Sequence, residues 1–225
     1  MHRLSRILTL FTLLLPFSTF AWTGADTESL LKKMEAAYGG VRDYQTDLEV
    51  RARRRDGSFT TKRVLYTFKK PHWIRLDFES PHPGMILVYP DAKGKAVVRP
   101  SGWAQFFKLR LAPDSFLLKV SAGQRIDQTD LGLLIRNISD SLTDRRHGQV
   151  EVAEDKGHIR IRVLADNHFR DGVATLYRFV IDRKLWLPVM AEESTPDGVL
   201  ERRVNFRNLR INIGVPDSFF RLNGG

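Results

Sequence analysis

Residues 43–78, DYQTDLEVRARRRDGSFTTKRVLYTFKKPHWIRLDF, carry the clearest structural signal in the chain. Apolar and polar side chains alternate along their first part, where Leu48 and Val50 are interleaved with Glu49 and Arg51. A period of two is typical of a strand with one covered face and one face in water. This stretch therefore predicts antiparallel β-structure at the start of the domain.

The same stretch contains its own turn. Asp56-Gly57 is a typical hairpin sequence, and the alternation resumes beyond it until Lys70-Pro71. A third strand follows. The inward-facing residues expected on the second and third strands are Val64, Tyr66, Phe68, Ile74, Leu76 and Phe78.

Alternation recurs along most of the remaining chain and predicts strands near 85–89, 96–99, 150–152, 159–163, 174–181, 185–194 and 200–211. Helical spacing appears only at 26–38 and at 129–142. We predict an α+β fold, an incomplete and strongly curved antiparallel β-barrel whose helices cover the concave face. A transmembrane barrel is disfavoured because one face is rich in arginine. The arginines concerned are Arg53, Arg75, Arg160, Arg162 and Arg203.

Residues 1–21 have the pattern of a secretory leader. Arg3 and Arg6 precede an apolar run over 7–17, and Thr19-Phe20-Ala21 is a small-x-small cleavage sequence. We expect the leader to be removed, leaving a single domain over 22–225 with a helical lid insertion at about 112–143. Because the chain has no cysteine, the sequence predicts no lipid anchor on a cysteine and no disulfides. The expected compartment is the periplasm.

The chain is strongly basic, with 36 Lys and Arg against 26 Asp and Glu and a formal net charge of +10. Such a charge attracts anions. In an exported protein the available anions are phospholipid headgroups, lipopolysaccharide and acidic polymers, so no nucleic acid partner is expected. Dispersed charges that only keep the domain in solution are the alternative explanation.

A search for reactive groups gives no catalytic constellation. The histidines lack the HExxH or HxH spacing of a metal site, and no GxSxG motif or phosphate-binding glycine loop is present. Glu192 and Glu193 should point to opposite faces of one strand. We therefore predict no catalytic residues, no metal, no cofactor and no enzymatic activity.

A curved sheet under a helical cover predicts an apolar cavity. We expect its wall to be formed by Leu48, Val50, Val64, Tyr66, Phe68, Ile74, Leu76 and Phe78. The lid is expected at Leu131, Leu134, Ile135 and Ile138, with Leu134, Ile135 and Ile138 filling the empty cavity. An acyl chain is the expected occupant, since leaving about 15 methylenes in water costs on the order of 12 kcal/mol. An ordinary packed core remains the alternative.

Four segments together resemble the periplasmic lipoprotein-carrier superfamily with the LolA/LolB-like fold. They are the helix at 29–38 leading into 41–44, FKKPHWIRL at 68–76, LGLLIRN at 131–137 and LRINIGVPDSFF at 209–220. The resemblance implies an incomplete barrel whose interior receives the acyl chains of lipoproteins on their way to the outer membrane. It also implies a lid contact from the residue before the proline, which is Lys70 here, where the family carrier has arginine.

Two functions follow from this resemblance. The first is a monomeric periplasmic carrier or chaperone for acyl chains of lipoproteins or other lipids, with transient membrane-surface contact and inner- and outer-membrane protein partners. The second is a sensor or interaction module in envelope regulation that binds a protein or an anionic lipid. In the second case, the basic strand around Arg51 and Arg53 would form the contact surface.

Overall fold

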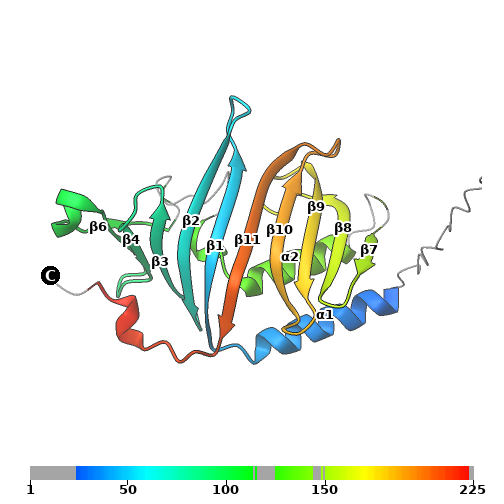
Figure 1. Cartoon of the computed structure of the whole chain (residues 1–225), viewed down its shortest axis with the longest axis horizontal. Helices are drawn as coiled ribbons and strands as arrows, with labels where there is room; N and C mark the ends of the chain where they lie inside the picture. Colours follow the sequence, from blue (N-terminus) through cyan, green and yellow to red (C-terminus); the bar gives the residue numbers. More distant parts are fainter. Residues whose placement is uncertain (1–23, 114, 116–124, 144–147, 149, 223–225) are drawn as a thin grey trace, which may run out of the picture.

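The computed structural model describes residues 24–113, 115, 125–143, 148 and 150–222. The predicted leader lies outside these residues. Figure 1 shows one broad sheet with two helices lying along it. In the described part of the chain, no helix has the length and apolar character needed to cross a bilayer.

The strands of the described residues join one antiparallel sheet of 11 strands. Its order is β6-β5-β4-β3-β2-β1-β11-β10-β9-β8-β7. The strands are β1 Asp43–Arg53, β2 Phe59–Lys69, β3 Trp73–Ser80, β4 Ile86–Tyr89, β5 Ala96–Arg99, β6 Leu109–Leu111, β7 Glu151–Glu154, β8 His158–Asp166, β9 Ala174–Asp182, β10 Leu187–Ser194 and β11 Leu200–Ile211. The sheet is open, because β6 and β7 form its two edges.

The strand order shows the path of the chain. It enters at the centre in β1, moves strand by strand to the edge at β6, and re-enters at the opposite edge in β7. From there it returns to the centre, where β11 pairs with β1. Residues 112–150 therefore connect the two edges of the sheet. Residues 125–143 of the predicted lid insertion lie in this connection, whereas residues 114 and 116–124 are outside the described residues.

The sheet is strongly curved. Leu111 on β6 and Phe179 on β9 line the same cavity, although eight strand spacings separate their strands. In a flat sheet, spacings of about 4.8 Å would place them about 38 Å apart. Because one cavity of about 400 Å³ touches both, the sheet must bend around it. The predicted fold class, an incomplete curved antiparallel barrel with helices, is confirmed.

Two helices cover one half of the concave face. α1 spans Gly24–Gly39 and α2 spans Leu131–Thr143. α2 packs against α1, β8 and β10, and α1 also reaches β10. In Figure 1 both helices lie along the half of the sheet that contains β8 to β11. Three short 3-10 helices complete the described elements, at η1 Gly102–Phe106, η3 Ile126–Gln128 and η5 Asp217–Phe220.

The core lies at the end of the sheet nearest α1. The ring of Tyr44 stacks on the rings of Tyr66 and Phe68, with centroids 5.8 and 5.1 Å away. All three side chains are essentially inaccessible to solvent, as are Met34 of α1 and Ile138 of α2. Since these residues come from both helices and from the central strands, one continuous core holds the helices on the sheet.

One region differs from the sequence expectation. The segment after β5 forms η1, which has no alternating pattern, and β6, which is only three residues long. Its large apolar side chains are exposed: Trp103 is 86% exposed and Phe106 is 83% exposed. The alternation of Leu109, Arg110 and Leu111 covers three residues, fewer than the roughly four that identify a strand, so β6 could not be recognised.

Candidate functional site

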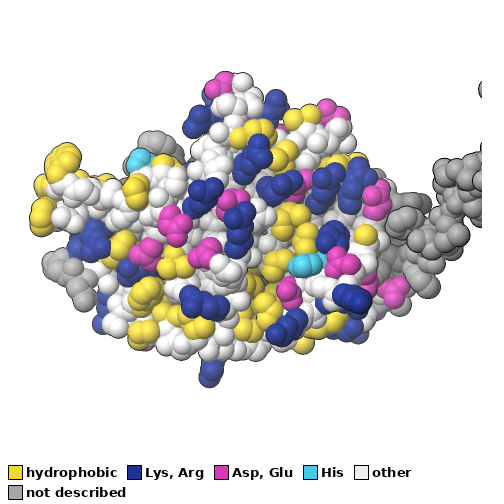
Figure 2. Space-filling model, viewed as in Figure 1, with side chains coloured by type: hydrophobic (Ala, Val, Ile, Leu, Met, Phe, Trp, Pro, Cys, Tyr) yellow, Lys and Arg dark blue, Asp and Glu magenta, His cyan; other side chains and the backbone are white. Residues whose placement is uncertain are grey.

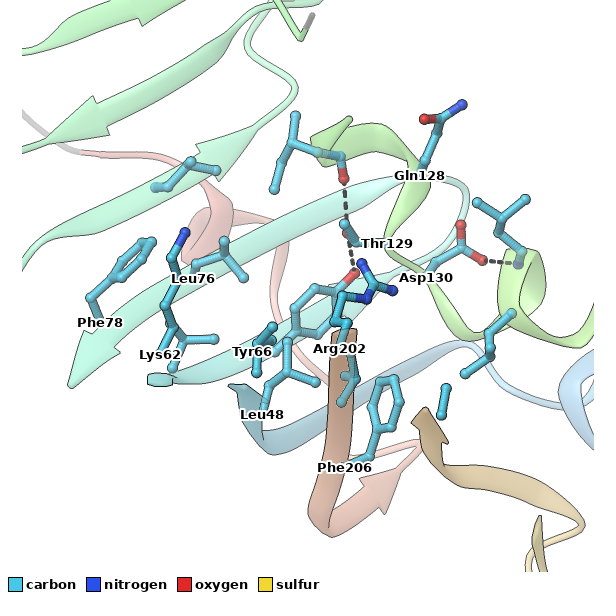
Figure 3. Close-up of a pocket in the computed structure, with 18 of the residues that line it drawn as sticks. Leu48, Lys62, Tyr66, Leu76, Phe78, Gln128, Thr129, Asp130, Arg202 and Phe206 are labelled. Carbon is cyan, nitrogen blue, oxygen red and sulfur yellow. Dashed lines mark hydrogen bonds between the residues drawn. The ribbon is translucent and has the colours of Figure 1, made fainter. Parts of the chain in front are cut away.

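A cavity of about 400 Å³ lies on the concave face. This volume is within the range of about 300–1,000 Å³ found for small-molecule sites. Figure 3 shows its lining side chains, which come from strands on both halves of the sheet and from the segment before α2. The apolar lining comprises Leu48, Val50, Val64, Tyr66, Leu76, Phe78, Met85, Leu87, Val98, Leu109, Leu111, Ile126, Leu133, Leu134, Phe169, Tyr177, Phe179, Ala191, Val204 and Phe206.

Six of the eight side chains predicted for the cavity wall lie on it. They are Leu48, Val50, Val64, Tyr66, Leu76 and Phe78. The other two, Phe68 and Ile74, are fully buried in the core below the cavity. They share the inward face with the lining residues, as predicted, but they lie nearer to α1. Alternation predicts the face of the sheet on which a side chain lies. It does not predict where along the strand the side chains become fully buried.

The predicted lid residues divide in the same way. Leu134 lines the cavity together with Leu133, whereas Leu131, Ile135 and Ile138 are buried in the core. The apolar stripe of α2 therefore packs mainly on the sheet and on α1. Only the first turns of α2 face the cavity. The side chains of Ile135 and Ile138 do not occupy it.

Three tyrosines hold the start of α2. Tyr38 of α1 donates a hydrogen bond to Oδ1 of Asp130 at 3.1 Å, and the hydroxyl of Tyr44 accepts one from the N–H of Leu131 at 3.1 Å. The hydroxyl of Tyr66 lies 3.3 Å from Oγ1 of Thr129. Burial raises the pKa of all three phenols well above the ordinary value, so they stay neutral. We call Tyr38, Tyr44 and Tyr66 the tyrosine clamp.

Two further details support the clamp. Asp130 also accepts a hydrogen bond from the N–H of Leu133 at 3.0 Å, which caps the first turn of α2. A Cβ atom added to Gly132 would lie 2.5 Å from Cε1 of Tyr38. Glycine at position 132 is therefore what allows the Tyr38 ring to reach Asp130.

Lys70 is connected to the lid indirectly, through Tyr38 of the tyrosine clamp. Its Nζ donates hydrogen bonds to the carbonyl oxygens of Tyr38 and Gly39, at 2.8 and 3.2 Å, and lies 4.5 Å from the centroid of the Tyr38 ring. A cation is favourable beside the free carbonyls at the end of a helix. Lys70 thus fixes the end of α1, and Tyr38 carries the connection to Asp130.

The cavity also contains an ion pair that the sequence analysis did not identify as part of it. Nη2 of Arg202 lies 3.2 Å from Oε1 of Glu193, and these side chains are 11% and 15% exposed. Both line the cavity. The signal was present in the alternation, because Arg202 shares its face of β11 with Val204 and Phe206. Glu192 points to the opposite face, as predicted, where it pairs with Arg178 and Arg203.

His168 also lines the cavity. The ring Nε2 of His168 is 2.9 Å from Oγ of Ser141, and its backbone N–H donates a hydrogen bond to the hydroxyl of Tyr177 at 3.1 Å. Burial lowers the pKa of His168 below the ordinary value. Across the described residues, no group of three or more His, Asp and Glu side chains could hold a metal ion.

Comparison with known proteins gives structural likeness only. No family model matches the chain and no curated protein matches its sequence. A LolA superfamily protein from Nitrosomonas europaea is 10% identical with a TM-score of 0.41 over 87% of this chain and 97% of its own. The Mycobacterium tuberculosis lipoprotein LppX is 10% identical with a TM-score of 0.44 over 86% and 99%. Structures similar to this chain thus include LolA superfamily proteins.

MucB, which is also known from a Pseudomonas aeruginosa complex with MucA, is 15% identical with a TM-score of 0.49. The match covers 89% of this chain and 64% of MucB, so this chain spans less than two thirds of that protein. These likenesses concern the fold. What the cavity of this chain binds has to follow from its own residues.

Proposed function

We propose that the protein is a periplasmic carrier or chaperone that binds the acyl chains of lipoproteins or other lipids in its concave cavity. The observation that supports this most strongly is the cavity itself: about 400 Å³, lined mainly by aliphatic and aromatic side chains. Each methylene moved from water into such a site is favourable by about 0.8 kcal/mol. An acyl chain gains a similar free energy per methylene in a bilayer, so its exchange between a membrane and the cavity is close to balanced and can run in both directions.

Entry of the chain depends on α2. The first turns of α2 face the cavity through Leu133 and Leu134, and hydrogen bonds of the tyrosine clamp hold them there. The remainder of the helix is fixed by buried apolar side chains. Opening of the first turn thus requires the loss of these hydrogen bonds and the exposure of Leu131, and not of the whole packed face. A cycle of binding and release requires a closed and an open state of α2 whose free energies differ by only a few kcal/mol.

The test is equilibrium binding of a fluorescent fatty acid to the purified protein. Saturable binding is expected, and Leu134→Asp should weaken it at least tenfold because a carboxylate would face the acyl chain in the cavity. Val199→Asp is the matched control, since Val199 is 39% exposed and lies away from the cavity. Absence of saturable binding to the native protein, or equal effects of both variants, would contradict the carrier function.

Membrane contact is assigned to the end of the molecule at η1. Trp103, Phe106 and Phe107 are 86%, 83% and 61% exposed there, and Figure 2 shows hydrophobic side chains projecting at this end, next to basic ones. Aromatic side chains with basic neighbours favour the membrane interface. Leu109 and Leu111, a few residues further on, line the cavity. Flotation with anionic vesicles should be lost in Trp103→Ser/Phe106→Ser and retained in Val199→Ser.

A second candidate function is binding of an acidic protein or lipid by the convex face. Two arginines surround each buried or half-buried glutamate there: Arg63 and Arg207 at Glu49, and Arg178 and Arg203 at Glu192. Figure 2 shows the resulting spread of basic side chains over this face. Arg51→Glu/Arg53→Glu should abolish capture of such a partner from membranes, whereas acyl binding in the cavity should be unaffected.

A further inference from the structure

Two basic side chains lie at the rim of the cavity, on the inward face of strands that flank β1. Arg202 on β11 pairs in register with Ala52, and Lys62 on β2 pairs with Val50. Both line the cavity. With strands about 4.8 Å apart, the two positions are separated by about 10 Å across the sheet. Figure 3 shows both side chains beside the apolar wall.

The inward faces of the same strands become apolar below this rim. Val204 and Phe206 follow Arg202 on β11, and Val64 and Tyr66 follow Lys62 on β2. Four residues of a strand span about 13 Å. The cavity is therefore amphipathic along the strand direction, with cations at the rim and an apolar wall of roughly that length leading toward α2.

The charges at the rim do not cancel. Glu193 pairs with Arg202, whereas Lys62 has no acidic partner within the described part of the chain. The Lys62 ammonium lies beside an apolar wall, where a low dielectric strengthens its attraction for an anion. The other carboxylate of the lining, Asp130, lies at the start of α2, where Tyr38 and the N–H of Leu133 donate hydrogen bonds to it. Placing an arginine and a glutamate on an apolar wall is also costly compared with two apolar side chains of similar volume. Stabilisation of the fold therefore does not account for the Arg202–Glu193 pair.

We propose that Lys62 and Arg202 bind the oxyanion headgroup of the ligand, so that the cavity selects an amphiphile with one acyl chain and a terminal carboxylate or phosphate. This selectivity rests on the function proposed above and names its ligand class. The guanidinium of Arg202 has a planar fork of N–H donors that matches either oxyanion. In the structure, the carboxylate of Glu193 contacts that fork. The ligand replaces it, and its chain lies along Val204 and Phe206.

The test compares hexadecanoate, hexadecyl phosphate and hexadecanol as competitors of a fluorescent acyl probe. The native protein should bind the two anions at least about tenfold more tightly than the alcohol. Lys62→Gln/Arg202→Gln should remove that preference without weakening hexadecanol, and Glu193→Gln should strengthen binding of both anions. Arg160→Gln, at an exposed arginine of β8 that pairs with the exposed Asp155, is the control and should leave the preference for anions unchanged. Inorganic phosphate should not compete, because it lacks the chain.

Several results would overturn this assignment. Equal affinity of the native protein for hexadecanoate and hexadecanol would contradict headgroup binding by Lys62 and Arg202 and leave the carrier function intact. If hexadecanoate, hexadecyl phosphate and hexadecanol all failed to bind, both proposals would be contradicted. Equal weakening of anions and alcohol in Lys62→Gln/Arg202→Gln would indicate damage to the cavity. Arg202→Met/Glu193→Leu guards against misfolding, because replacing a buried pair with apolar residues retains stability. It must also lose the preference for anions.

Discussion

The hydroxyl of Tyr44 accepts a hydrogen bond from the backbone N–H of Leu131 at 3.1 Å, although 87 residues separate them in the chain. Tyr44 lies on β1 in the centre of the sheet and is fully buried, and Leu131 is the first residue of α2. The first turn of a helix has N–H groups without partners inside the helix. The core of the sheet thus provides one of the contacts that hold the lid closed.

Tyr44→Phe should lower the free energy of unfolding by about 1–3 kcal/mol, because a buried N–H loses its acceptor. The same change weakens the closed position of α2, so binding of a fluorescent acyl probe should become faster. Urea unfolding and stopped-flow binding measure the two effects. Tyr89→Phe is the control, since within the described residues the hydroxyl of Tyr89 makes no hydrogen bond. An unchanged rate of probe binding would contradict the role of Tyr44 in closing the lid.

Gly132→Ala should displace the start of α2. The added Cβ would lie 2.5 Å from the Tyr38 ring, and overpacking of this kind costs about 1–3 kcal/mol. A lower melting temperature is expected, together with faster hydrogen exchange at the amides of Leu131 and Leu133. Gly39→Ala is a suitable comparison, because a Cβ there meets no atom within 4 Å. If both alanine variants behaved alike, close packing at Gly132 would not be what positions Tyr38.

Lys70→Met should loosen the end of α1, because the carbonyls of Tyr38 and Gly39 lose a charged donor. A loss of about 1 kcal/mol in the free energy of unfolding is expected for this partly buried contact at the end of a helix. Lys70→Arg retains the charge and should recover most of the loss. A full loss in the arginine variant would show that the geometry of the lysine, and not its charge, is required.

His168 should make the protein less stable in mild acid. Its pKa is lowered in the folded state, so the unfolded chain takes up the proton first. The stabilisation is complete above the ordinary histidine pKa of about 6.5 and decreases as the pH falls below it. Melting temperatures of native protein and His168→Gln should therefore converge as the pH falls below about 6.5. A constant difference over this range would exclude a contribution from His168 protonation.

Most of the fold could be predicted from the sequence because the inward and outward faces of the strands differ so clearly. Leu48 and Val50 alternate with Glu49 and Arg51 on β1, and both line the cavity on the inward face. The same rule was sufficient to place Arg202 inside the cavity, since it precedes Val204 and Phe206 by two and four residues. Arginine is nevertheless so common on the outer faces of this sheet that its inward position went unrecognised.

Two features could not be predicted: how deeply each inward-facing side chain is buried, and which residues distant in the sequence contact one another. Phe68 and Tyr66 look equivalent in the sequence, yet Tyr66 lines the cavity and Phe68 lies in the closed core. The difference arises from where the helices cover the sheet, which no local pattern records. The tyrosine clamp joins residues 63 to 92 positions apart. Its members look like ordinary core aromatics until the folded chain brings their hydroxyls to the start of α2.

The most direct test of an acyl-binding cavity is to locate a bound chain. A hexadecanoate that carries a photoreactive diazirine near its tail would be bound to the native protein, irradiated, and the labelled peptides identified by mass spectrometry. We predict labelling of Leu48, Leu134 and Phe206, all of which line the cavity, with loss of label when unlabelled hexadecanoate is added. Labelling confined to the exposed η1 segment, or insensitive to unlabelled hexadecanoate, would contradict binding inside the cavity.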